Sequence, residues 1–386
     1  MKKILLVDDD ALVLELYRKK LAQSGFEVRT AGDGLEAVKL LGTFTPDFIV
    51  LDLMMPKLSG TDVLKFIRSK PALAKIPVAV LTNAFMSDQA RAVNALGVDR
   101  AIVKGDCTPM KMLEIANQIL VVPTPASATT PAAPALDTAV VNNEARESFL
   151  KNVPADFTDL RSVSQEFAQD PAAASRSGNL KEFCRQTHHL AGAAASARCH
   201  TIALLSGALE ALLYELGEKP QFINPSTTHT VSIAVDFLST LVENARNGRR
   251  MDLLGGEVLV VDDDPLANRI ALAALSRAKL SARATENPLT ALDLLAKQHF
   301  DLVLLDIEMP HMDGFELCRK LRDLPGYEHT PVIYVTSHAD FENRARCLGF
   351  GGHDLIAKPI FPIELAVKAV MHLIRGKLVA PTAANE

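Results

Sequence analysis

The chain has 386 residues, of which 48% are hydrophobic and 23% charged, a composition typical of globular proteins in water. Its formal net charge of −5 offers no overall attraction to nucleic acid or to an anionic membrane, and without Trp it lacks a usual base-stacking residue. The five cysteines show no CxxC spacing, and no apolar run has the length of a membrane span. We therefore expect a cytoplasmic protein with reduced thiols, without nucleic-acid binding or membrane insertion.

Residues 1–122 alternate short apolar runs with helical patterns, which predicts an open, doubly wound α/β domain. Continuous apolar runs suit strands that are buried on both faces of a parallel sheet. We expect such strands at Ile4–Val7, Phe48–Leu51, Val78–Leu81 and Ala101–Val103. Helices are expected between them at Leu12–Ser24, Gly34–Leu41, Gly60–Ser69 and Asp88–Leu96.

The middle of the chain has a different composition. Residues 123–141 are rich in Pro, Ala and Thr without an apolar period, which is typical of a linker. Residues 142–248 contain no strand-like run, and a central all-α four-helix bundle is the natural arrangement for them. The expected helices are Phe149–Val153, Leu160–Phe167, Leu180–Ala197, Thr201–Leu216 and Ser226–Asn247.

A second α/β domain is predicted at 256–377, after a short linker at 249–255 and before a tail at 378–386. Its expected strands are Val258–Val261, Leu302–Leu305, Val332–Val335 and Leu355–Ala357. This domain repeats polar residues of the first at a constant offset of 254 positions and without a gap. The residues Asp8, Asp9, Asp52, Thr82 and Lys104 recur as Asp262, Asp263, Asp306, Thr336 and Lys358. Such repetition indicates a duplicated site.

In both copies the repeated polar residues directly follow predicted strands. Ligands of an open parallel sheet bind at the carboxyl ends of its strands, so the five side chains of each copy are expected to converge. Three carboxylates placed together repel one another unless a cation joins them, and Mg²⁺, which prefers oxygen ligands, meets this need. The combination suits phosphoryl transfer, in which one carboxylate is the nucleophile and Lys and Thr contact the phosphoryl oxygens.

Each terminal domain resembles, over essentially its full length, the receiver domains of two-component response regulators, whose sheet is five-stranded, parallel and flavodoxin-like. The resembling positions in the first copy are Val7-Asp8-Asp9, Leu51 to Pro56, Gly60, Thr82 and Lys104. The resemblance implies that phosphate is accepted on Asp52 and Asp306, aided by Thr82, Thr336, Lys104 and Lys358. It also implies Mg²⁺ as the cofactor, held by Asp8, Asp9, Asp52, Met54, Asp262, Asp263, Asp306 and Glu308. Among these, the Met54 and Glu308 ligands are backbone carbonyls.

The two copies differ at informative positions. Lys358 is followed by Pro359, where receivers commonly have a cis peptide bond, whereas Gly105 takes that place in the first copy. The residues two positions after the acceptors, Met54 and Glu308, differ as well. We therefore expect unequal phosphoryl lifetimes in the two domains.

A predicted helix in the middle of the chain carries the adjacent pair His188 and His189, both outside its apolar face. Small neighbours give His188 a flat surface against which another protein can pack. The segment resembles the His-x-Leu-Lys-Gly signature of histidine phosphotransfer domains in His188, Leu190 and Gly192, with Ala191 in place of Lys. Neutral imidazole is a nucleophile near pH 7, which suits this chemistry. The alternatives are a pair of solvated helix residues or, less favoured, a metal site, because adjacent helix residues point about 100° apart and no carboxylate completes a cluster.

These features predict a bacterial phosphorelay protein that exchanges phosphoryl groups among Asp52, His188 and Asp306 or with external partners. A sensor histidine kinase or another phosphotransfer protein, and a downstream protein, are the expected partners, and receiver surfaces also suit a homodimer. The sequence shows no ATP-binding signature of a kinase, so we expect no enzyme beyond weak autophosphatase activity. Two alternatives remain: an adaptor whose receivers switch protein contacts, and a phosphate sink.

Overall fold

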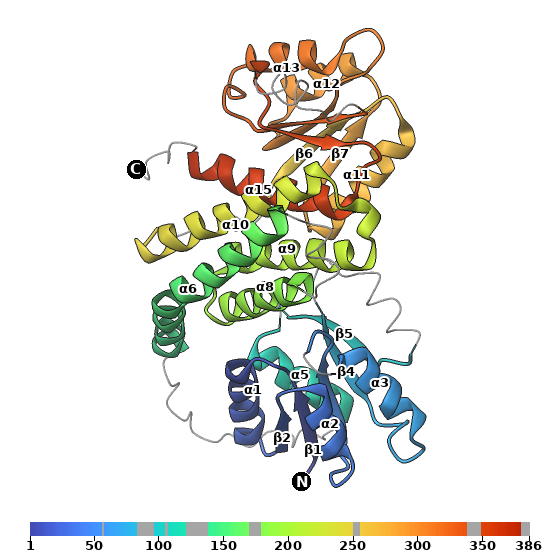
Figure 1. The fold of residues 1–386 in the computed structure, drawn as a ribbon, viewed down its shortest axis with the longest axis vertical. Helices are drawn as coiled ribbons and strands as arrows, with labels where there is room; N and C mark the ends of the chain where they lie inside the picture. Colours follow the sequence, from blue (N-terminus) through green and yellow to red (C-terminus); the bar gives the residue numbers. More distant parts are fainter. Residues whose placement is uncertain are drawn as a thin grey trace, which may run out of the picture. The chain divides into compact units, whose positions relative to one another are not determined.

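The computed structural model describes residues 1–55, 58–82, 96–104, 107–120, 138–169, 179–249, 255–337 and 349–379. Most of the predicted helix at Asp88–Leu96, the linker positions 123–137 and Gly105 lie outside these ranges. The chain divides into two compact units, residues 1–156 with 185–203, and residues 157–184 with 204–386. Figure 1 labels helices and strands of both units. Within the described residues, no helix combines the length and apolar character needed to cross a bilayer.

The first unit contains a five-stranded parallel sheet in the order β2-β1-β3-β4-β5. Its strands are β1 (Lys3–Val7), β2 (Glu27–Ala31), β3 (Phe48–Asp52), β4 (Val78–Thr82) and β5 (Arg100–Val103). The accompanying helices are α1 (Ala11–Gln23), α2 (Gly34–Leu41), α3 (Gly60–Ser69) and α5 (Pro109–Leu120). The four predicted strands and the first three predicted helices of this domain are confirmed within one or two residues at each end.

The sheet is covered on both faces, which explains the continuous apolar runs. Alternate residues of β1 enter different cores: Leu5 and Val7 pack in one, and Ile4 and Leu6 pack in the other. Both cores are fully buried, as expected for a doubly wound sheet. Strand β2 was not predicted on its own because its sequence, EVRTA, has no continuous apolar run, and only Ala31 among its residues is buried.

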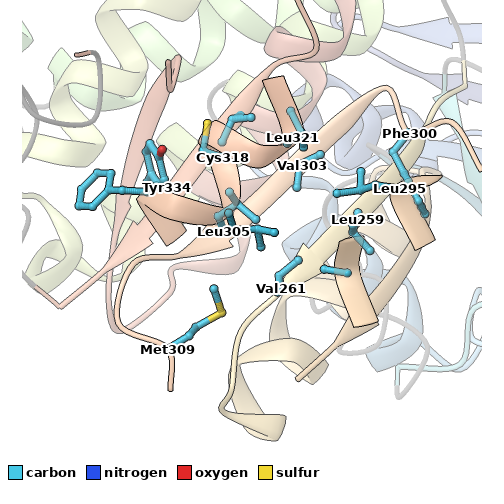
Figure 2. Packing of buried hydrophobic residues seen from close by; sticks show 14 of the residues in the cluster. Leu259, Val261, Leu295, Phe300, Val303, Leu305, Met309, Cys318, Leu321 and Tyr334 are labelled. Atoms are coloured by element: carbon cyan, nitrogen blue, oxygen red, sulfur yellow. The ribbon is translucent and has the colours of Figure 1, made fainter. Parts of the chain in front are cut away.

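The second unit contains a sheet of the same topology, in the order β10-β9-β8-β6-β7. Its strands are β6 (Glu257–Val261), β7 (Ser281–Thr285), β8 (Leu302–Asp306), β9 (Val332–Thr336) and β10 (Asp354–Ala357). Its helices are α11 (Pro265–Arg277), α12 (Pro288–Lys297), α13 (Gly314–Arg322) and α15 (Pro362–Val379). Figure 2 shows one of its two cores, where Leu259, Val303 and Tyr334 come from three neighbouring strands. The four predicted strands of this domain are confirmed.

Four long helices lie between the two sheets in the sequence: α6 (Thr138–Gln169), α8 (Asn179–Ser196), α9 (His200–Glu218) and α10 (Pro225–Arg246), with a 3-10 turn η2 (Pro220–Phe222). The separate helices predicted at Phe149–Val153 and Leu160–Phe167 are one helix, α6, which also starts within the predicted linker. Pro154 removes one backbone donor, but a buried row continues across it through Val153 and Phe157. The packing of the four helices as a bundle stays a prediction.

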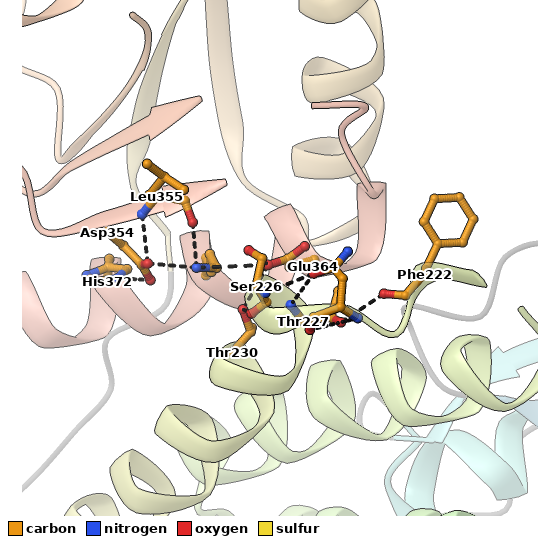
Figure 3. A network of polar contacts seen from close by, with 10 residues as sticks. Phe222, Ser226, Thr227, Thr230, Asp354, Leu355, Glu364 and His372 are labelled. Carbon is orange, nitrogen blue, oxygen red and sulfur yellow. Dashed lines mark hydrogen bonds and ion pairs between the residues drawn. The ribbon is translucent and has the colours of Figure 1, made fainter. Parts of the chain in front are cut away.

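A buried polar network joins α10 to α15 inside the second unit (Figure 3). The hydroxyls of Ser226 and Thr230 donate to Glu364 Oε1 at 2.6 and 2.9 Å. The ammonium of Lys368, which is fully buried, donates to Asp354 Oδ1 at 2.7 Å and to the carbonyl of Leu355 at 2.8 Å. This network and its apolar surroundings hold α10 against the last helix of the second α/β domain.

Candidate functional site

The predicted polar residues of the first domain meet at the carboxyl edge of its sheet. Asp8 follows β1, Asp52 ends β3, Thr82 ends β4 and Lys104 follows β5. The Lys104 ammonium donates to Asp52 Oδ2 at 2.7 Å and to Asp8 Oδ1 at 3.0 Å. Strand order brings these side chains together, because β1, β3 and β4 are direct neighbours. The predicted convergence is therefore confirmed.

Glycine at the start of α3 allows the chain to close over this edge. A Cβ atom on Gly60 would lie 2.0 Å from the carbonyl oxygen of Asp52. Gly314 stands in the same relation to Asp306, at 2.2 Å. No side chain fits at these distances, so the shared glycine is a packing requirement that fixes each helix start against the acidic edge.

The first site is deeply buried, and burial dominates its electrostatics. The side chains of Asp8 and Asp52 are each 2% exposed, and that of Lys104 is 12% exposed. Burial raises the pKa of Asp8 to about 7, and the Asp52 charge adds to this while Lys104 opposes it. Burial also acts to raise the pKa of Asp52, but the nearby Lys104 and His188 outweigh it and hold that pKa well below its usual range. Asp52 is thus the ionised member of the pair.

The first site fits a divalent cation with oxygen ligands. Asp8 Oδ2 and Asp9 Oδ1 are buried and have no hydrogen-bond partner among the described residues. Three carboxylates face a single ammonium group, so negative charge is in excess. The Met54 N–H donates to Asp52 Oδ1 at 3.2 Å, which places Met54 next to the cluster. These properties match the oxygen-rich surroundings that Mg²⁺ prefers.

His188 on α8 reaches into this acidic pocket. Its Nε2 lies 3.2 Å from Asp52 Oδ2, 3.7 Å from Asp9 Oδ1 and 3.4 Å from the Lys104 ammonium. The side chain is 9% exposed, so the alternative that both histidines are solvated helix residues is wrong for His188, whereas His189 is exposed. The helix pattern alone did not reveal this burial, because residues far away in the sequence supply the polar pocket that buries His188.

Gly192, one of the small residues near His188, lies close to Asp10 of the first receiver domain. A Cβ atom on Gly192 would lie 3.3 Å from Asp10 Oδ2, a distance tighter than most real contacts of this kind. Gly192 is one helical turn after His188, so its missing side chain lets this face of α8 come close to the acidic edge. The mid-helix glycine, which costs about 1 kcal/mol in helix propensity, therefore has a packing reason.

The second site brings together the corresponding Asp and Lys residues. Lys358 donates to Asp306 Oδ2 at 2.8 Å and lies 2.9 Å from Asp262 Oδ2. Thr336 ends β9 and is buried, and the Glu308 N–H donates to Asp306 Oδ1 at 3.3 Å. Burial raises the pKa of Asp306, and the adjacent Asp262 charge adds to this.

The two sites differ in composition and in exposure. Within the described residues, the groups able to hold a metal ion are Asp9 with Asp52 and His188, and Asp262 with Asp263 and Asp306. The second group is made of carboxylates alone, and Asp263 is exposed to solvent. The Lys358–Pro359 bond is cis, as the resemblance led us to expect. The expectation that no carboxylate completes a cluster with His188 was wrong, because Asp52 lies beside it although 136 positions separate the two in the sequence.

A family model for the response regulator receiver domain matches residues 4–117 and 258–370, which together are more than half of the chain. The chain belongs to the response regulator receiver family. It contains two receiver domains, and this places it in two-component phosphorelay signalling. Receiver domains generally bind Mg²⁺ through an acidic pocket, and both domains have an aspartate-rich group of that kind.

Two curated relatives match this chain over a third of its length or less. The response regulator PleD of Caulobacter vibrioides is 36% identical over 126 residues, which are 33% of this chain and 28% of PleD. The sensor histidine kinase RcsC of Escherichia coli is 38% identical over 103 residues, which are 27% of this chain and 11% of RcsC. Among solved structures, the chemotaxis response regulator CheY4 of Vibrio cholerae is 28% identical and covers 31% of this chain and 99% of its own, with a TM-score of 0.30. The matched region is thus a small part of both PleD and RcsC.

Proposed function

We propose that the chain is a phosphorelay protein in which His188 and the first receiver exchange a phosphoryl group directly. One observation carries this proposal: the imidazole Nε2 of His188 lies 3.2 Å from Asp52 Oδ2, inside the buried acidic pocket. A solvated helix residue has no reason to be buried there. The phosphotransfer signature around His188 and the four long helices of the middle region support a histidine phosphotransfer domain between the receivers.

The nucleophile and the leaving group of the exchange are both in the pocket. With phosphate on an Asp52 carboxylate oxygen, neutral His188 attacks phosphorus through the Nε2 lone pair. The N–P bond forms as the O–P bond breaks, and the electron pair returns to the Asp52 carboxylate, whose charge the Lys104 ammonium balances. The product is a phosphoramidate on His188, and the reverse step rebuilds the acyl phosphate. Thr82 and Lys104 are placed to contact the phosphoryl oxygens during transfer.

The observed contact is the resting state of this pair. Nε2 must stand about 3–3.5 Å from phosphorus before attack, and with the O–P bond this requires roughly 5 Å between Nε2 and the carboxylate oxygen. The measured 3.2 Å is about 2 Å shorter, so the region of α8 around His188 must withdraw by that amount when Asp52 is phosphorylated. The resting contact therefore keeps the two reacting groups together without a phosphoryl group between them.

The cofactor proposed for both receivers is Mg²⁺. Asp8, Asp9, Asp52 and the Met54 carbonyl would hold the ion in the first receiver, and Asp262, Asp263, Asp306 and the Glu308 carbonyl in the second. When bound, Mg²⁺ neutralises charge on the phosphoryl oxygens.

The second receiver is proposed to exchange phosphate with an external partner. Asp306 would be its acceptor, with Lys358 and Thr336 on the phosphoryl oxygens. Asp263 is exposed, and the described part of this site contains no histidine, so a partner's histidine has to come from outside. A sensor histidine kinase or another cytoplasmic phosphotransfer protein supplies that chemistry. We propose no kinase activity for the chain itself.

The relay is tested by following labelled phosphate in the full chain. In an Asp306→Asn background, a small-molecule phosphodonor with Mg²⁺ should label Asp52 first and His188 next. Acid-labile, base-stable label reports phosphohistidine, and the opposite stability reports acyl phosphate. His188→Gln should remove the acid-labile label, whereas the neighbouring variant His189→Gln should keep it. Acid-labile label of equal size and rate in His188→Gln would refute exchange through His188.

A second function, a phosphorylation-dependent switch, is favoured by the same short contact. Because a phosphoryl group does not fit in 3.2 Å, phosphorylation of Asp52 must displace His188 even if no transfer follows. In that case the receiver would act as an adaptor that releases α8 for another protein. The labelling experiment separates the two functions, since an adaptor keeps all label on Asp52.

A further inference from the structure

The contact between His188 and Asp52 places an imidazole nitrogen among carboxylate oxygens, and both kinds of atom can bind a metal ion. His188 Nε2 lies 3.2 Å from an oxygen of Asp52 and 3.7 Å from an oxygen of Asp9, and ligand atoms of all three residues lie within 4.8 Å of one another. Two ligands bound to one first-row metal ion at about 2.1 Å lie roughly 3.0–3.4 Å apart in octahedral or tetrahedral geometry. The three side chains therefore have nearly the spacing of a metal chelate.

Charge and unsatisfied oxygens in the pocket point in the same direction. Asp8, Asp9 and Asp52 surround the single ammonium of Lys104, so the carboxyl groups of the pocket outnumber its cation. Asp8 Oδ2 has no hydrogen-bond partner among the described residues, although the Asp8 side chain is only 2% exposed. Asp9 Oδ1, the atom that faces His188, is also buried and also has no hydrogen-bond partner among these residues. A divalent cation matches this charge excess.

We propose that Asp9, Asp52 and docked His188 form a binding site for a divalent first-row transition metal, with Zn²⁺ as the reference ion. Imidazole is a favourable ligand for Zn²⁺, whereas Mg²⁺ prefers oxygen ligands and gains little from it. Metal binding at this site does not require phosphotransfer. It requires only that His188 is docked beside Asp52. A metal ion bound there would occupy the Nε2 lone pair and an Asp52 oxygen, which are the two reacting atoms, and would hold α8 in place.

Zn²⁺ binding to the unphosphorylated full chain tests this site, measured by competition with a chromogenic chelator. An Asp263→Asn background weakens the second acidic group, so that the first dominates the titration. His188→Gln should lower the Zn²⁺ affinity at least tenfold, because one of three side-chain ligands is lost. The same variant should change the Mg²⁺ affinity less than twofold. His189→Gln, an exposed change at the next position of α8, should leave both affinities unchanged.

Equal Zn²⁺ affinity in the His188→Gln variant and its parent would overturn the proposal. An equal loss in His189→Gln would do the same, since it would show a surface histidine site. Asp9→Asn is the second variant, and it should weaken Zn²⁺ and Mg²⁺ together because Asp9 serves both ions. Zn²⁺ binding that survives Asp9→Asn would also count against the site. These measurements use no phosphate, so a failed relay and a failed metal site give different results.

Discussion

At the residue scale, burial of charge is the dominant feature of the first receiver site. Asp8 is almost fully buried, and burial raises its pKa from the ordinary 3.8 to about 7. A carboxyl group with a raised pKa contributes its full stability below its unfolded pKa and loses that contribution as the pH rises through the folded pKa. In metal-free buffer, Asp8 should therefore destabilise the first receiver increasingly between about pH 4 and pH 7.

The variant Asp8→Asn tests this charge effect. Asn retains an oxygen that can accept the hydrogen bond which the Asp10 N–H gives to Asp8 Oδ1. We expect the variant to be more stable than the parent at pH 8 by about 2 kcal/mol, and we expect this gain to shrink toward pH 4. Denaturant unfolding of the full chain with a chelator, at pH 5.5 and pH 8, measures it. A gain that is the same at both pH values would contradict the account.

His188 shows what the sequence reveals about a residue and what it leaves out. Its type, helical setting and neighbours Leu190 and Gly192 were sufficient to single it out as a candidate phosphotransfer residue. Its burial was not predictable, because the apolar pattern of α8 reports only which face packs on hydrophobic neighbours. The pocket that buries it is polar and comes from Asp9, Asp52 and Lys104, more than 80 positions away. Local periodicity carries no information about such a contact.

At the element scale, strands with a continuous apolar run were readable from the sequence, including the edge strands β5 and β10, and strands without such a run were not. The fully buried runs of β3 and β8 were predicted, whereas β2 and β7, which lie at sheet edges and are mostly half-buried, were missed as individual elements. The buried network between α10 and α15 was also missed. Its members, such as Thr230 and Lys368, are ordinary polar residues in their own helices and become a network only when the helices pack.

The buried network between α10 and α15 predicts that replacing Lys368 strongly lowers the free energy of unfolding. Lys368 is fully buried between Asp354 and Glu364, so Lys368→Met would leave two buried carboxylates without their cation. We expect a loss of about 3–5 kcal/mol in unfolding free energy, as is usual when one partner of a buried ion pair is removed. Lys320→Met is the matched control, because Lys320 forms an exposed pair with Glu316 and should cost less than about 1 kcal/mol. Similar losses in both variants would contradict this view of the network.

The approach of α8 to the first receiver depends on the missing side chain at position 192. Leucine at Gly192 would collide with Asp10, since even a Cβ atom would lie 3.3 Å from its carboxylate. We expect Gly192→Leu to slow label transfer from Asp52 to His188 at least tenfold, because a displacement of about 1 Å at reacting atoms can cost 100-fold in rate. His189→Leu adds the same side chain on the exposed face of α8 and should leave the rate unchanged. Equal rates in the two variants would show that close approach at Gly192 is unimportant.

At the scale of the whole molecule, the two receiver domains share one fold and one set of Asp and Lys residues, but different residues surround their acceptor aspartates. The first has His188 within contact distance of Asp52, and the second has a carboxylate group with Asp263 exposed. Duplication, fold and both acidic groups were predictable from the constant offset of 254 positions. The pairing of the histidine with the first receiver was not, because the sequence places His188 between two nearly equivalent partners. Only the contact itself distinguishes them.

The most direct test of the central claim is time-resolved mass spectrometry of the full chain after phosphorylation of the first receiver. Phosphate should be found first on Asp52 and then on His188, with the His188 signal rising as the Asp52 signal falls. Blocking Asp306 by Asp306→Asn should leave this exchange intact, whereas Asp52→Asn should remove phosphate from His188. Phosphate that stays on Asp52 until hydrolysis, with His188 never labelled, would contradict the account.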